Sequence, residues 1–120
     1  MSIKIDVSIG ELIDKITILE IKFERISETD KRQNIEKELA ILSDTWFNSG
    51  FDVDKIAGQR AQLKEINETL WDIEDEIRAL ESAQSFGDSF VALARRVYLT
   101  NDERSRVKRQ VNEILGSALI

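Results

Sequence analysis

The chain has 120 residues, of which 42% are apolar and 33% charged, a composition typical of one folded, helix-rich domain spanning 1–120. It contains no cysteine, histidine or proline, which excludes disulfides, thiolate chemistry and imidazole-based mechanisms. The net charge of −6 argues against general nucleic-acid binding. No apolar run approaches the roughly 18 residues of a membrane span, and no signal-peptide pattern is seen, so a cytoplasmic protein is expected.

The first residues predict a short extended segment followed by a helix start. Apolar and charged residues alternate over 3–7, a period of two that is typical of a strand. No second strand-like stretch follows, so this segment is expected to lie across the helices or to pair with the same segment of a second copy. Ser8 and Glu11 then match a capping box, in which each side chain accepts a hydrogen bond from the backbone N–H of the other.

Apolar residues at spacings of three and four predict about five helices after this cap. The predicted ranges are about 8–27, 31–46, 54–84, 86–99 and 100–116. The third would be roughly 45 Å long at 1.5 Å per residue, and shorter helices must cover its apolar stripe. The last would begin at a second capping box, at Thr100, and end at Gly116. The fold class is therefore all-α: an elongated antiparallel bundle or hairpin of about five helices around one long central helix.

The first helix has an unusually wide apolar surface. Ile13, Ile18 and Ile21 widen it beyond a single stripe, so more than one neighbour must cover this helix. Together with the unpaired segment at 3–7, this favours a homodimer.

Four carboxylates are candidate metal ligands. Glu11 and Asp14 lie one turn apart on the first helix. The third helix presents two such pairs, Glu65 with Glu68 and Asp72 with Asp75, of which Glu68 and Asp72 are the candidates. Carboxylates on facing helices could hold Mg²⁺, as in all-α nucleotide pyrophosphohydrolases, although the order of the acidic pairs differs from theirs. The alternative is a solvated acidic helix surface.

A basic region near the C-terminus is a candidate anion site. Residues 88–115 carry six bases and four acids (+2), whereas the remainder carries 11 bases and 19 acids (−8). Tyr98, Asn101, Arg104 and Lys108 are the binding candidates, because arginine binds phosphate oxygens through paired hydrogen bonds. The alternative is that these bases pair with acids of the third helix.

Lys15, Lys22 and Arg25 suggest a further possibility. Their segment resembles the first helix of all-α chorismate mutases, which grip two carboxylates with basic side chains. An arginine expected upstream in that family is missing here.

Three stretches resemble a small bacterial all-α family of unknown function, with members of about this size. They are Ser8–Lys22, Ile66–Asp75 and Asn101–Arg104. The resemblance spans nearly the whole chain and implies one intact helical domain. Some members lie near genes for surface-polysaccharide synthesis, which implies at most a link to glycan metabolism.

The sequence therefore favours a non-enzymatic interaction or scaffold protein that self-associates and has no cofactor. Besides the homodimer, binding to another protein is also expected. The alternative function is a Mg²⁺-dependent enzyme acting on a nucleotide or another phosphate-containing substrate.

Overall fold

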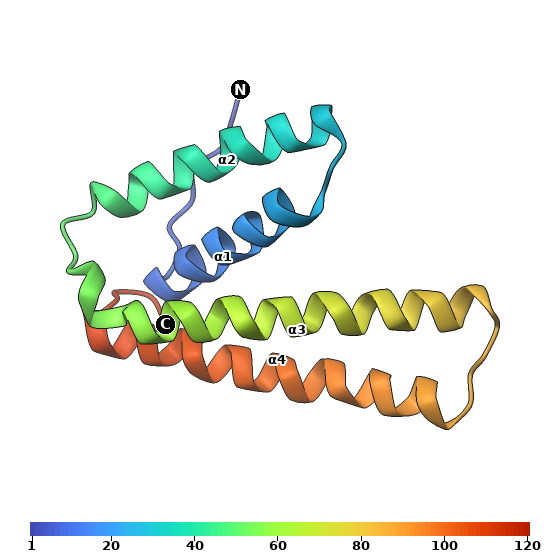
Figure 1. Ribbon diagram of the computed structural model, residues 1–120. Coiled ribbons are helices and arrows are strands. Elements are labelled where there is room, and N and C mark those ends of the chain that lie inside the picture. The colour runs from blue at the N-terminus through green and yellow to red at the C-terminus, as the bar shows by residue number, and fades with distance from the viewer.

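The computed structural model describes residues 1–120 and is all-helical, as the sequence predicts, with no strand. Its elements are α1 (Ile9–Arg25), α2 (Thr29–Phe47), a short 3-10 helix η1 (Val53–Ile56), α3 (Ala57–Ser82) and α4 (Asp88–Leu115). Figure 1 shows two hairpins, α1 with α2 and α3 with α4, and α1 lies between α2 and the second hairpin. The molecule is elongated, with extents of 49 × 34 × 25 Å.

Helix α4 is continuous where the sequence predicts two helices, so the prediction of five helices is wrong and there are four. The capping-box match that begins at Thr100 lies inside α4. Between Val97 and Val107 this side of α4 carries the half-buried polar residues Thr100, Asn101 and Arg104, and the helix packs along α3 over its length. Because α4 has 28 residues and α3 has 26, the long element is a pair of helices of similar length, not one central helix.

The hydrophobic core lies where α1 crosses the second hairpin. Its buried residues come from every helix and from η1: Ile13, Ile16, Trp46, Ile56, Leu63, Ile66, Leu70, Val107 and Val111. Helix α2 lies close only to α1 and contributes one buried residue, Trp46. Full burial of a large aliphatic side chain is worth about 1.5–3 kcal/mol, so most of the apolar stabilisation is concentrated at this end of the molecule.

Only half of the predicted capping box forms at the start of α1. The Ser8 hydroxyl accepts a hydrogen bond from the Glu11 N–H at 3.1 Å, as predicted. The Glu11 carboxylate does not return the bond, because it accepts one from Lys108 Nζ at 2.6 Å instead. A charged partner on α4 competes better for this carboxylate than a neutral backbone N–H does.

The C-terminal part of the chain caps the same helix end. The Gly10 N–H donates to Asn112 Oδ1 at 2.6 Å, and the Ile9 N–H donates to Ser117 Oγ at 3.1 Å. At Gly10 the backbones of α1 and α4 touch, since a Cβ there would lie well inside 3.0 Å of the Lys108 carbonyl oxygen. Glycine is therefore required for this close approach.

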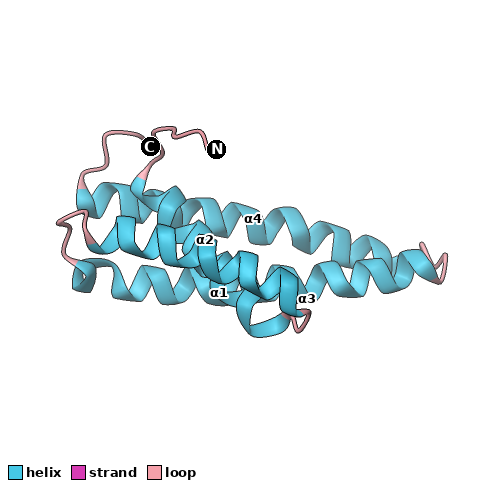
Figure 2. Cartoon of the chain, turned by 90° about the horizontal axis from the view of Figure 1, so that it is seen from above, coloured by secondary structure: helices cyan, strands magenta, loops and turns pink.

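The segment at 3–7 forms no strand and is not covered by the helices. The side chains of Ile3 and Ile5 are 91% and 76% exposed. Figure 2, a view from above, shows both chain termini at the same edge of the molecule. The expectation that this segment lies across the helices is therefore wrong.

The second hairpin extends beyond the first, as Figures 1 and 2 show. Between residues 74 and 106 no residue is buried. We call residues 74–100 the hairpin arm. None of the four helices combines the length and the apolar composition that crossing a bilayer requires.

Candidate functional site

Polar side chains interrupt the core between α1, α3 and α4. Asp14, Thr17 and Asn67 are 1%, 0% and 6% exposed, and the Arg104 side chain beside them is 27% exposed. We call these four residues the polar layer. A buried charge is unfavourable unless it is paired and hydrogen-bonded. The partners of the Asp14 carboxylate therefore decide whether the fold can bury this charge.

Asp14 is the centre of the polar layer. Its Oδ1 accepts hydrogen bonds from Arg104 Nε and from Asn67 Nδ2, both at 2.9 Å. Its Oδ2 accepts a second hydrogen bond from Arg104, through Nη2, so the guanidinium holds the carboxylate with two parallel bonds. Asn67 Nδ2 also donates to Thr17 Oγ1 at 3.0 Å, and that hydroxyl donates to the Asp14 carbonyl at 2.7 Å.

A second cation extends the layer toward the start of α1. Lys108 Nζ lies 3.9 Å from Asp14 Oδ2 and 2.6 Å from Glu11 Oε2, so two acids of α1 face two bases of α4. The hydrogen bonds that Arg104 donates to Asp14 raise the pKa of the Arg104 guanidinium above its usual value. The negative charges of Asp14 and Glu11 add to this effect, and partial burial opposes it. Arg104 is therefore a permanent cation.

The four predicted metal ligands fall into two separate networks. Glu11 and Asp14 pair with the bases of α4, whereas Glu68 and Asp72 pair with Arg25 at 3.8 and 2.6 Å. Each of the four carboxylates therefore has a cationic partner. No group of three or more acidic side chains is arranged to hold a metal ion.

Three of the four predicted binding residues meet at the polar layer. Arg104 and Lys108 bind the carboxylates of α1, and Arg104 Nη1 donates to Asn101 Oδ1 at 3.4 Å. Tyr98 lies apart on the hairpin arm, 53% exposed, where its hydroxyl accepts a hydrogen bond from Arg95 at 3.4 Å. The alternative prediction, that the bases pair with acids of the third helix, is wrong for Arg104 and Lys108, because their partners lie on α1.

Asn67 and Thr17 were not among the predicted site residues. Asn67 follows the buried Ile66 on α3 and reaches the core, where an amide is unfavourable without partners. The position of Asn67 beside the apolar stripe of its helix could have indicated a buried polar residue. Thr17 gave none, because a threonine is common on half-buried helix surfaces.

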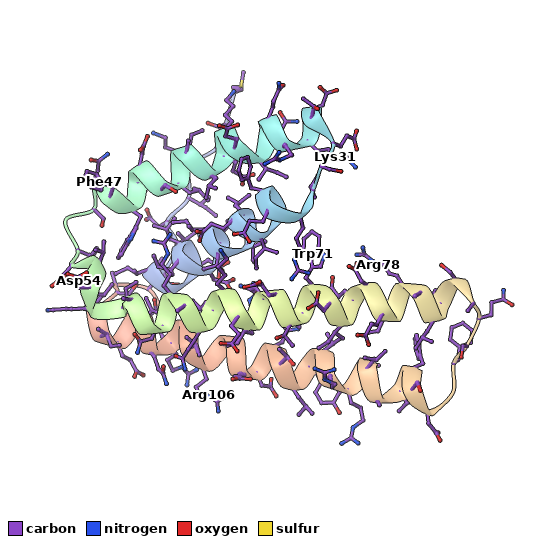
Figure 3. The ribbon with its side chains drawn as sticks, in the orientation of Figure 1. Lys31, Phe47, Asp54, Trp71, Arg78 and Arg106 are labelled. Atoms are coloured by element: carbon purple, nitrogen blue, oxygen red, sulfur yellow. The ribbon has the colours of Figure 1, made fainter.

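A pocket of about 370 Å³ opens beside the polar layer, between α1, α3 and α4. Its lining residues are Ile18, Ile21, Lys22, Asn67, Leu70, Trp71, Glu74, Asp75, Arg78 and Arg104. We call it the α1–α3 pocket. Figure 3 shows Trp71 and Arg78 projecting from the side of α3 that faces the first hairpin. The Arg25 guanidinium lies 5.8 Å from the centroid of the Trp71 ring.

These features define a small all-helical protein in which one hairpin packs on half of a longer one around a buried ion pair. The chain belongs to the family of unknown function DUF6165, whose family model matches residues 3–120. This confirms the resemblance to a small family of unknown function that the sequence suggests. No match was found among curated proteins or among solved structures.

Proposed function

We propose that this protein is a non-enzymatic interaction domain that self-associates, with two copies packing through the hairpin arm. The arm carries the proposal because its apolar residues have too few neighbours within one chain. They are Ile77, Leu80, Phe90, Leu93 and Val97, all only half-buried. In a hairpin of two helices, each helix buries only the side that faces the other. Further helices are needed to bury the rest of the apolar surface.

The outer surface of α4 adds exposed apolar groups to the arm. Val91 and Tyr98 are each 53% exposed and lie seven residues apart, which places them on one side of the helix. Leu99, also 53% exposed, lies next to Tyr98, further around the helix. These exposed apolar side chains are available to a protein partner on the outer surface of α4.

Charge complementarity favours a second copy of the chain as the partner. On α3, residues 74–82 carry four acids and one base (−3), and on α4, residues 88–100 carry one acid and two bases (+1). No ion pair joins α3 to α4 within the chain. In a two-fold arrangement that sets α3 of each copy against α4 of the other, the acidic surface faces the basic one twice.

Light scattering coupled to size-exclusion chromatography tests this proposal. At micromolar concentration the protein should have twice the 13.8 kDa mass of one chain. The double variant Val91→Glu/Tyr98→Glu should be a folded monomer, because it removes the apolar stripe and adds acids to the basic helix. The matched control is Ile41→Glu, which changes an exposed apolar residue of α2 and should leave the dimer intact.

Two results would refute the arm as the interface. One is a monomer mass for the unaltered protein at about 100 μM, a concentration at which a micromolar dimer is almost fully formed. The other is a dimer that survives Val91→Glu/Tyr98→Glu but is lost when residues 1–7 are deleted. That outcome would move the interface to the exposed N-terminal segment.

A further inference from the structure

Arg104 presents unused hydrogen-bond donors at the α1–α3 pocket. A guanidinium has five N–H groups, of which Asp14 accepts two and Asn101 accepts one across 3.4 Å. The side chain lines the pocket and remains 27% exposed. Because Asp14 holds it with two bonds, the guanidinium is fixed in orientation before any ligand arrives, which lowers the entropy lost on binding.

Lys22 adds a second cation to the same pocket. It lies in the last turn of α1, lines the pocket and is half-buried, yet it forms no ion pair. Of the other charges that line the pocket, Arg78 lies 3.9 Å from Glu74, and Asp75 is an exposed carboxylate without an ion pair. Lys22 and the free donors of Arg104 are therefore the positive groups available to an anion.

Apolar side chains complete the pocket. Ile18, Ile21, Leu70 and Trp71 contribute to its walls, and Trp71 supplies an aromatic ring. The volume of about 370 Å³ falls within the usual range of roughly 300–1,000 Å³ for small-molecule sites, which combine apolar walls with a few convergent polar groups.

We propose that the α1–α3 pocket binds a small molecule in which an oxyanion, phosphate or carboxylate, is attached to a planar apolar group. Arg104 and Lys22 bind the oxyanion, and the planar group packs against Trp71. The pocket shares Glu74, Asp75 and Arg78 with the hairpin arm, but Lys22, Trp71 and Arg104 lie outside the arm. Ligand binding and dimerisation are therefore tested on different residues, so either proposal can fail without the other.

Fluorine NMR can report on the pocket directly. The chain has two tryptophans, Trp71 in the pocket and Trp46 in the core at 5% exposure, so labelling with 5-fluorotryptophan gives two resonances. Phenyl phosphate should shift the Trp71 resonance saturably and leave that of Trp46 in place. Inorganic phosphate should compete with it. Benzoate tests the carboxylate, and its binding relative to phenyl phosphate shows which oxyanion the pocket prefers.

The decisive variant is Lys22→Gln, which removes a cation that the fold does not use. It should weaken phenyl phosphate binding about tenfold, the usual effect of losing one charge-assisted contact. Lys37→Gln, an exposed lysine of α2 without an ion pair, is the matched control and should bind as the unaltered protein does. Equal affinity of the Lys22→Gln variant and the unaltered protein would overturn the proposal. A Trp71 resonance unmoved by all three probes, or moving together with that of Trp46, would overturn it too.

Discussion

Replacing Arg104 with methionine should destabilise the fold by about 3–5 kcal/mol, the usual effect of removing one partner of a buried ion pair. Asp14, at 1% exposure, would be left charged in the core. Its remaining partners would be Asn67 Nδ2 at 2.9 Å and Lys108 Nζ at 3.9 Å. Neither replaces the two bonds of the guanidinium, because the amide is neutral and the lysine is already held by Glu11.

The two partners of this ion pair should not be equivalent. Asp14→Asn should be less harmful than Arg104→Met, at about 1–3 kcal/mol, since the Arg104 side chain is 27% exposed and water can solvate it. The double variant Asp14→Leu/Arg104→Met should recover most of the loss, because replacing a whole buried ion pair with apolar groups is often neutral or stabilising.

Urea unfolding followed by circular dichroism measures these free energies at one fixed protein concentration. For 120 residues, the unfolding entropy is about 0.25 kcal/mol/K, so a loss of 3–5 kcal/mol should lower the melting temperature by about 12–20 °C. Arg106→Met, a change to an exposed arginine on the same helix without an ion pair, is the control and should stay within about 0.5 kcal/mol. A smaller loss of stability for Arg104→Met than for Asp14→Asn would refute this account of the buried ion pair, and so would a loss under about 1 kcal/mol for both variants.

Three further predictions concern the backbone and one surface charge. Gly10→Ala should lower the unfolding free energy by about 2 kcal/mol or more, because its Cβ would clash with the α4 backbone, whereas Gly58→Ala, with open space around it, should raise it by about 0.5–1 kcal/mol. Gln84 has a φ of 53°, so Gln84→Gly should raise the melting temperature by a few degrees, and no rise would argue against strain there. The hydrogen bond to Glu24 raises the pKa of Lys64 above its ordinary value. The charge on Lys64 therefore stabilises the fold fully below that ordinary pKa, and this stabilisation is lost as the pH rises through the raised pKa. The Lys64→Met variant should therefore show a smaller loss of stability between pH 10 and 12 in urea titrations, and an equal loss would contradict this assignment.

The local features of the fold could be predicted from the sequence. The range 31–46 comes close to α2, and the predicted end at Gly116 matches the end of α4, where this glycine has a φ of +65°. Apolar spacing, a serine cap and a glycine stop act within one or two turns. Neighbouring residues in the sequence therefore contain the necessary information.

The supposed helix start at Thr100 shows the limit of local reasoning. A capping box describes how a helix could begin, not whether the preceding helix ends. Here α4 packs along α3 on both sides of Thr100, so the helix continues past this residue and keeps its backbone hydrogen bonds. Ending a helix at that point would leave several N–H and C=O groups without partners, and packing against α3 makes continuation favourable.

The polar layer could not be predicted because its partners are far apart in the sequence. Asp14 and Arg104 are separated by 90 residues, and Asp14 and Asn67 by 53. From spacing alone, Glu11 and Asp14 are simply two acids on one helix, which suits a metal site, a solvated surface or an ion pair equally well. Only the tertiary contact with α4 distinguishes among these.

The buried ion pair also explains how a helix as apolar as α1 adopts one position. Ile13, Ile16, Leu19 and Ile21 are all buried, and apolar contacts alone would tolerate a shift of α1 along the second hairpin. A shift of one turn would move Asp14 about 5.4 Å and leave it charged without Arg104. We infer that the polar layer sets the register of α1 against α3 and α4. That register fixes the walls of the α1–α3 pocket and leaves the hairpin arm uncovered, so both proposed sites depend on the same ion pair.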